Sequence, residues 1–70
     1  MERQRVSSSN IASVGYDPTT LTLEVEFRSA SVYQYFGVPD HTYQALMRAA
    51  SKGSYFKDYI KDRYRFRQVR

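Results

Sequence analysis

The side chains with chemical potential in this sequence are cationic and aromatic. Seven basic residues are candidate contacts for a nucleic-acid backbone: Arg48, Lys52, Lys57, Lys61, Arg63, Arg65 and Arg67. The aromatic residues Tyr55, Tyr64 and Phe66 stand among them, and this mixture suits phosphate contacts combined with base stacking. A solvated helix face followed by a basic tail would show the same composition, with Asp58 and Asp62 neutralising part of the charge. The seven residues therefore define a hypothetical nucleic-acid-binding surface.

Positive charge is concentrated toward the C-terminus. The chain has 70 residues and a formal net charge of +4, and eight of its eleven Lys and Arg residues lie in residues 45–70. Residues 11–44 carry more acidic than basic side chains. An uneven positive field attracts anionic partners, and nucleic acid is the first candidate.

Tyr33 and Tyr35 are the second group of interest. They lie two residues apart in the strand-like segment Val32–Phe36, so their side chains share one face of that strand. On the surface they would form a platform for bases, each stack contributing ~1–3 kcal/mol. Facing inward they would pack beneath the helices. Gln34 occupies the other face, and an amide buried in a small core would need partners, so the parity favours a structural role for both tyrosines.

No set of residues indicates an enzyme. The chain has one histidine, His41, and no cysteine, so the side chains that usually bind zinc are lacking. Glu24 and Glu26 superficially form a carboxylate pair, but alternation along a strand explains them. Ser51 and Ser54 are better suited to cap helices than to act as nucleophiles, and no nucleophile motif surrounds them. We therefore predict a non-enzymatic protein without a metal or cofactor.

Three strands are expected to position the tyrosines and the acidic residues. Ile11–Tyr16 and Val32–Phe36 have the composition of strands. Leu21–Phe27 alternates apolar with polar side chains, as a strand with one buried face and one wet face does. The connections between the three are short, which predicts an antiparallel meander.

Two helices are expected to follow the strands. Asp40 is predicted to cap the first helix, and Gly53 to end it in a left-handed conformation. Ser54 is predicted to cap the second helix, which would run through about Arg63. Both helices carry apolar residues at helical spacing, so one face of each is expected to cover the sheet.

The fold class predicted from these elements is α+β: a three-stranded antiparallel β-meander packed against two short C-terminal helices. Residues 1–8 are predicted to form a flexible N-terminus, 9–64 a single domain and 65–70 a basic C-terminal tail. The predicted core consists of Val14, Leu21, Leu23, Val25, Phe27, Tyr33, Tyr35, Leu46, Met47, Phe56 and Ile60.

Several short motifs, taken in order, resemble those of a known family. They are Val14-x-Tyr16, Leu23-x-Val25-x-Phe27, Tyr33-x-Tyr35-x-x-Val38-Pro39, Tyr43-x-x-Leu46 and Ala49-x-Ser51-x-Gly53-x-Tyr55-Phe56, followed by Ile60 and Tyr64. Together they resemble the KTSC domain, named for its occurrence at the C-terminus of some lysyl-tRNA synthetases and also found as a stand-alone bacterial protein. The resemblance makes Tyr33-Gln34-Tyr35 the family hallmark and implies RNA binding, a role suggested for a family whose function is not established. Ala30 stands where the family usually has a turn glycine, and Lys57 where asparagine is common.

Three classes of function follow as expectations. The first is a small module that binds RNA or tRNA through its basic C-terminal surface. The alternative is a protein–protein interaction module that docks to another chain, or to itself, by a sheet edge or exposed aromatic residues. Contact with an anionic membrane is a third expectation, although the sequence has no long basic amphipathic helix. The lack of an apolar leader, a membrane-spanning stretch and cysteine predicts a cytoplasmic protein.

Overall fold

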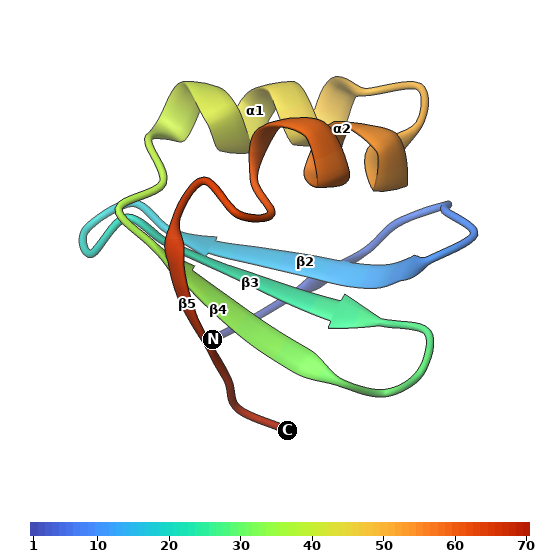
Figure 1. The fold of residues 1–70 in the computed structure, drawn as a ribbon, viewed down its shortest axis with the longest axis horizontal. Coiled ribbons are helices and arrows are strands. Elements are labelled where there is room, and N and C mark those ends of the chain that lie inside the picture. The colour runs from blue at the N-terminus through green and yellow to red at the C-terminus, as the bar shows by residue number, and fades with distance from the viewer.

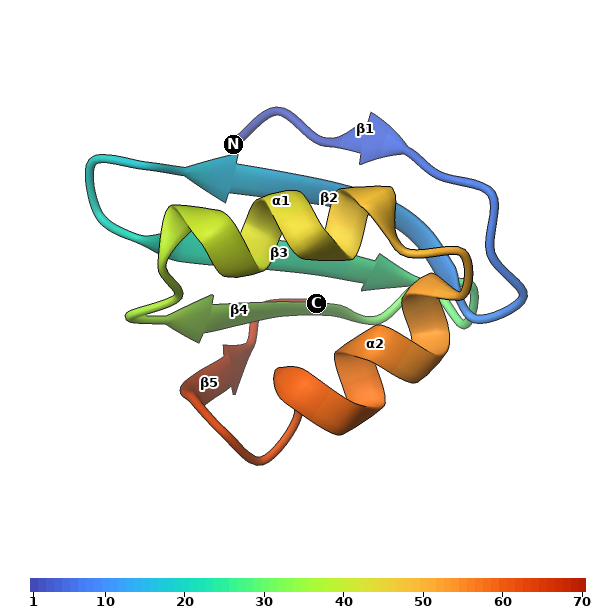
Figure 2. The ribbon, with the colours of Figure 1, turned by 90° about the horizontal axis from the view of Figure 1, so that it is seen from above.

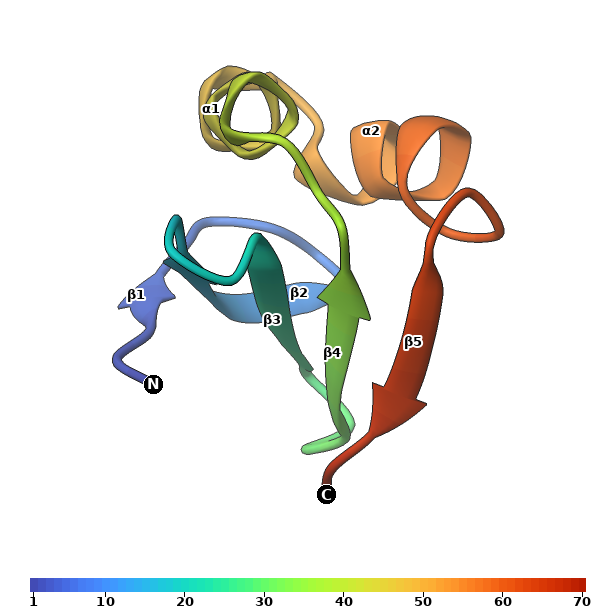
Figure 3. The same ribbon diagram turned by 90° about the vertical axis from the view of Figure 1, so that its left-hand side faces the viewer.

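The fold is a five-stranded antiparallel sheet with two helices on one face (Figure 1). A computed structural model describes residues 1–70. Its elements in chain order are β1 (Gln4–Arg5), β2 (Ile11–Asp17), β3 (Thr22–Phe27), β4 (Val32–Phe36), α1 (Asp40–Arg48), α2 (Lys52–Tyr59) and β5 (Arg65–Gln68). The strands lie in the sheet in their sequence order. Figure 3 shows both helices on the same side of the sheet, so the predicted α+β class is confirmed.

The prediction of three strands is wrong, because a short strand extends the meander at each edge. β2, β3 and β4 form the predicted meander, while β1 pairs with β2 and β5 pairs with β4, all antiparallel. β1 and β5 lie within residues 1–8 and 65–70, where a flexible N-terminus and a tail were predicted. β1 has only two residues and every residue of β5 is exposed, so neither strand carries the buried alternation that reveals a strand in a sequence.

The core lies between the helices and one face of the sheet. Its fully buried members include Leu23 and Val25 of β3, Leu46 of α1, and Ile60 after α2. Tyr35 is 5% exposed and belongs to this cluster. Its neighbour on the same strand face, Tyr33, packs against the cluster and is half-buried. The inward parity predicted for the two tyrosines is therefore confirmed.

Leu21 is the predicted core residue that the structure places outside. It is 40% exposed because its φ of 57° puts it in the turn before β3, out of the pleat that Leu23 and Val25 share. Phe27, Tyr33 and Met47 are half-buried around the core rather than inside it. Ile11 and Val38 are fully buried without having been predicted. A bulge follows Ile11 and the reversal at Gly37, whose φ is 75°, precedes Val38, so simple alternation misses both.

Four predicted helix boundaries are wrong. Pro39 rather than Asp40 occupies the N-cap of α1, and Asp40 is the first helical residue. Gly53 does not end α1 but lies in the first turn of α2. Ser51, not Ser54, caps α2, since its Oγ accepts a hydrogen bond of 3.3 Å from the Ser54 amide. α2 ends at Tyr59, short of the predicted limit.

Candidate ligand-binding groove

A groove separates α2 from the sheet surface carried by β3, β4 and β5. In Figure 2, α1 runs along the sheet, whereas α2 crosses at an angle and ends near β5. The groove contains two adjoining pockets, of about 440 Å³ and about 400 Å³, each within the size range of small-molecule sites. Phe27, Phe56 and Lys61 line both pockets, so the pockets are continuous.

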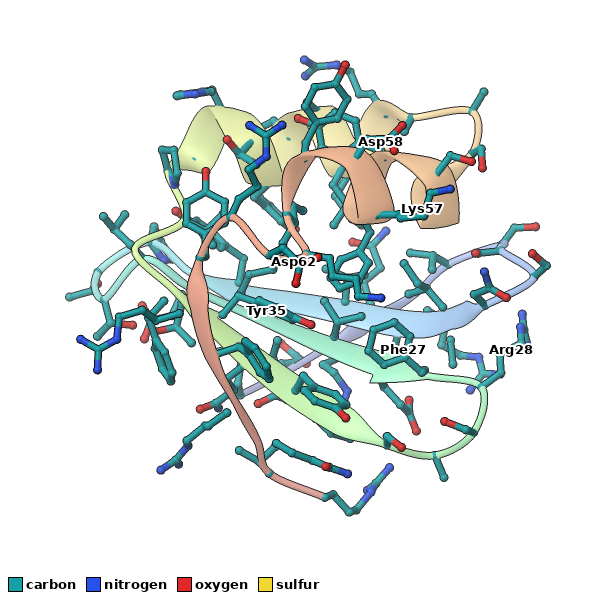
Figure 4. The ribbon with its side chains drawn as sticks, in the orientation of Figure 1. Phe27, Arg28, Tyr35, Lys57, Asp58 and Asp62 are labelled. Carbon is teal, nitrogen blue, oxygen red and sulfur yellow. The ribbon has the colours of Figure 1, made fainter.

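The first pocket is cationic, and we call it the cationic pocket. Arg28 follows β3, Lys57 lies on α2, and Lys61 lies in the turn after α2, and all three line it. Asn10 and Ser29 add polar atoms to the wall. None of the three cations forms an ion pair within the chain, because the only ion pairs involve Arg3 and Arg70. Figure 4 shows Lys57 above Phe27, with Arg28 at the end of the same groove.

The second pocket has an aromatic floor, and we call it the aromatic pocket. The strand register places Tyr35 directly opposite Phe66 of β5, with Tyr33 two residues along the same strand face. The Phe66 ring centroid lies 5.6 Å from that of Tyr35 and 5.9 Å from that of Tyr33. Phe56 of α2 meets Tyr35 edge-to-face at 5.3 Å. Phe66 is 54% exposed, so this floor is open to a ligand on one side.

Tyr35 presents a hydroxyl group to the aromatic pocket. Burial, with the nearby Tyr33 and Asp62, raises the pKa of Tyr35 to about 12, so its phenol is protonated at neutral pH. The hydroxyl makes no hydrogen bond within the chain, and because no buried side-chain oxygen lacks a partner, the Tyr35 oxygen is in contact with solvent. Asp62 lines the same pocket from the turn after α2 and is exposed. In Figure 4, Asp62 lies over Tyr35.

The structure does not gather the seven basic residues of the sequence hypothesis on one surface. Lys57 and Lys61 meet in the cationic pocket. Arg65 and Arg67 flank Phe66 on β5, so their side chains project from the opposite face of the sheet. There Arg65 pairs with Phe36 and Arg67 with Gln34 across the strands. The remaining three lie elsewhere: Arg48 ends α1, Lys52 begins α2, and Arg63 lies in the turn before β5. Lys52 donates a hydrogen bond of 3.1 Å from Nζ to the Ala49 carbonyl.

Sequence reasoning missed Arg28 and Phe27 as groove residues. Arg28 lies in the short connection between the predicted strands Leu21–Phe27 and Val32–Phe36, and nothing in its sequence neighbourhood marks it as part of a site. Its Nε donates a hydrogen bond of 2.7 Å to the Ser8 carbonyl, which ties the side chain to the segment before β2. Only the antiparallel pairing brings this turn beside α2, thirty residues later in the chain.

Glu24 and Glu26 lie on the sheet face away from the groove, in a polar network. Glu24 accepts hydrogen bonds from Arg3 and from Gln34 Nε2, the latter at 2.8 Å, and it is 6% exposed. Burial raises the pKa of Glu24. The hydrogen bonds from Gln34 and Arg3 lower this pKa, and the net result lies below the ordinary value. A hydrogen bond from Ser13 does the same for Glu26. Both carboxylates are thus ionised at neutral pH, with structural partners rather than an acid–base role.

Two further features bear on the class of protein. No group of three or more His, Cys, Asp or Glu side chains lies close enough together to hold a metal ion. Neither helix has the length and apolar character needed to cross a membrane. The molecule is thus defined by a helix-covered meander with a Tyr-x-Tyr strand facing its core and a cationic, aromatic groove beside it.

This chain belongs to the KTSC domain family, whose family model matches residues 7–64. A KTSC domain protein from Yersinia pestis is 46% identical, with a TM-score of 0.96 over 99% of this chain and 97% of that one. An uncharacterized protein from Stutzerimonas stutzeri is 41% identical over 70 residues, 99% of both chains. A lysine–tRNA ligase from Nostoc is 44% identical over 61 residues, which are 87% of this chain but only 11% of the ligase. The resemblance stated from the sequence is therefore confirmed.

Proposed function

We propose that this chain is a non-enzymatic RNA-binding module and that the groove beside α2 is its principal contact. The observation that carries the proposal is the convergence of Arg28, Lys57 and Lys61 on one pocket that continues into an aromatic floor. Cations that contact phosphates, next to rings on which bases stack, are the combination used by proteins that bind single-stranded nucleic acid. Similarity to a segment of lysine–tRNA ligases favours RNA over DNA as the partner.

The three cations are available to bind phosphate because none of them forms an ion pair with a carboxylate of the folded chain. Each phosphate neutralised by a lysine or arginine releases counterions, so binding to single strands weakens with a slope of about −0.7 per contact in a plot of log affinity against log salt. Three contacts would give a slope of about −2.

Docking by a sheet edge is the competing function, and the character of the edges disfavours it. β1 offers two residues for pairing. The outer edge of β5 carries Arg65 and Arg67, and charged residues on edge strands oppose pairing with another strand. A chain that binds no RNA but self-associates through β5 would favour this function instead.

The test compares two variants that lose the same charge at different places. K57A/K61A removes two cations from the groove, and R65A/R67A removes two from β5 on the opposite face. Fluorescence anisotropy with single-stranded RNA, tRNA and duplex DNA at several salt concentrations measures affinity and slope. We expect the groove variant to lose about tenfold or more in RNA affinity and to reduce the salt slope by about 1.4, and the β5 variant to lose far less.

Two results would overturn the proposal. In the first, the wild-type chain at about 100 μM and low salt binds none of the three nucleic acids, although even non-specific binders have dissociation constants of about 100 μM or lower. The other is an equal loss of affinity in both variants, which would mean that binding responds to total charge and not to the groove.

A further inference from the structure

The aromatic pocket carries a carboxylate, which is an unexpected group in a site for a polyanion. Asp62 lines the pocket beside Tyr33, Tyr35 and Phe66, and the phosphate-attracting cations are concentrated in the neighbouring cationic pocket. A carboxylate here repels phosphate but accepts hydrogen bonds from N–H groups. Asp62 is therefore placed for the base of a nucleotide, while Lys61, which lines both pockets, is placed for its phosphate.

The floor of the pocket suits a flat ring. The Phe66 plane is inclined by 32° to that of Tyr35 and by 48° to that of Tyr33, so the pocket offers the faces of individual rings and not one flat surface. Phe66 is the most open of them, at 54% exposed. A base stacked on Phe66 or Tyr33 would lie with an edge toward the turn that carries Asp62. Stacking of this kind accepts every base, so any preference must come from the polar groups.

We propose that the aromatic pocket selects an unpaired guanine base, which Asp62 recognises through the N1–H and N2–H donors. This inference rests on the proposed RNA-binding function and names the base that the same groove prefers. Guanine is the one standard RNA base with two adjacent donors on its Watson–Crick edge, which match the two oxygens of a carboxylate. Adenine, cytosine and uracil each place an acceptor beside a donor there, and that acceptor would face the carboxylate.

The Tyr35 hydroxyl complements this arrangement. It is protonated and has no partner within the chain, so it can donate to an acceptor on the base or the ribose. The acceptor nearest the guanine N1–H is O6. The phenol donor and the two carboxylate oxygens can therefore make three hydrogen bonds to the acceptor–donor–donor edge of guanine, one more than the acceptor–donor edge of any other standard base allows.

The test uses short uridine-tract RNAs that differ at one central nucleotide: guanosine, adenosine, cytidine, uridine or inosine. Inosine keeps the N1–H but lacks the N2 amine, so it removes one of the two proposed hydrogen bonds. The wild-type chain is expected to bind the guanosine RNA at least fivefold more tightly than the adenosine, cytidine or uridine RNA, the lower end of discrimination by a bidentate base contact, with inosine in between.

D62N is the matched variant. Asp62 has a φ of 66°, a left-handed conformation that asparagine also tolerates, so the turn is retained while one acceptor becomes a donor. D62N is expected to bind guanosine and inosine RNA equally and to lose its preference for guanosine over adenosine, without losing affinity for the uridine RNA. D58N is the control, because it removes the same charge from α2 outside the pocket lining and should keep the guanosine preference.

The outcomes separate this inference from the proposed function. Wild-type affinity that is measurable and salt-dependent but equal for all five RNAs overturns guanine selection and leaves RNA binding standing. A guanosine preference that survives in D62N also overturns the role of Asp62. No binding to any of the five RNAs overturns the RNA-binding function and this inference with it.

Discussion

Glu24 is the residue whose environment departs most from its sequence pattern. Alternation along β3 predicted a solvent-facing carboxylate, yet Glu24 is nearly as buried as the core. The N-terminal segment covers it: a Cβ on Gly15, its cross-strand neighbour, would lie 2.6 Å from the Glu2 carbonyl oxygen. Burying a carboxylate is costly unless it is paired, and Arg3 and Gln34 supply the pairing. The charge of Glu24 thus depends in part on Arg3, which lies in the predicted flexible N-terminus.

Replacing Arg3 with alanine is expected to destabilise the fold by about 1–3 kcal/mol at neutral pH, because Glu24 keeps its burial and loses its cationic partner. The folded pKa of Glu24 is below its ordinary value of 4.5, so the stability it contributes is complete above that value and is lost as pH falls through the folded pKa. The penalty of R3A should therefore shrink as the pH falls below 4.5 and through the folded pKa of Glu24. Urea unfolding of both chains between about pH 7 and about pH 3 measures it.

Arg5 provides the control for this prediction. It lies on β1 as well, is exposed and forms no ion pair, so R5A should change stability by less than about 0.5 kcal/mol. Equal penalties for R3A and R5A, or an R3A penalty that stays constant to low pH, would contradict the role assigned to the Arg3–Glu24 pair.

At the scale of elements, the turn between β3 and β4 holds an alanine in a conformation that suits glycine. Ala30 has a φ of 77°, and its amide donates a hydrogen bond of 2.9 Å to the Phe27 carbonyl. Hairpin loops of this length commonly place glycine at the left-handed position, because a Cβ there is strained. The resembled family usually has a glycine in this turn, and the positive φ of Ala30 gives the physical reason for that glycine.

A30G is expected to stabilise the chain by about 0.5–1 kcal/mol. Relief of about 1–2 kcal/mol of left-handed strain outweighs the added freedom of the unfolded chain. A45G is the opposite control, since Ala45 lies within α1 and glycine there should cost about 1 kcal/mol. Thermal or urea unfolding measures both, and a loss of stability in A30G would show that the turn needs the Ala30 side chain.

Elements could be predicted from the sequence where a buried face repeats along them. The alternation of Leu23 and Val25 revealed β3, and the parity of Tyr33 and Tyr35 revealed which way β4 faces. The helix ends were predicted wrongly because more than one residue is suited to each cap. Ser51 and Ser54 stand three residues apart, and only packing decides which of them caps α2. The two edge strands were not predicted because pairing with a neighbouring strand forms them, and their own residues show no strand pattern.

At the scale of the whole molecule, the groove could be predicted only in part. Lys57 and Lys61 were identified because they are cations four residues apart. Arg28 and Phe66 join them only through the meander, which brings the β3–β4 turn and β5 to the same side of α2. Arg65 and Arg67 resemble groove residues in the sequence, but the pleat of β5 sends them to the other face. The charge pattern alone cannot separate Lys57 and Lys61 from Arg65 and Arg67. Only the pairing of β5 in the sheet decides which face the two arginines occupy.

The extent of the folded unit is the last property that belongs to the whole molecule. The family model ends at residue 64, whereas β5 begins at Arg65, pairs with all but the first residue of β4 and places Phe66 against Tyr33 and Tyr35. The predicted limits of the domain, residues 9–64, also exclude β5. Hydrogen bonds join Val32 to Val69 and Arg70, so the pairing continues beyond the strand itself. We therefore expect the minimal stable unit to include β5.

A chain ended after Tyr64 is expected to lose about 2–4 kcal/mol of stability, since several backbone hydrogen bonds at about 0.5–1.5 kcal/mol each disappear together with the Phe66 contacts. A 70-residue domain has about 4–10 kcal/mol in total, so this loss is a large fraction of its stability. F66A keeps the β5 backbone and should lose less, which separates the ring from the strand. Urea unfolding with gel filtration measures stability and any self-association at the exposed β4 edge. A truncated chain as stable as the full one would place the boundary of the domain at residue 64.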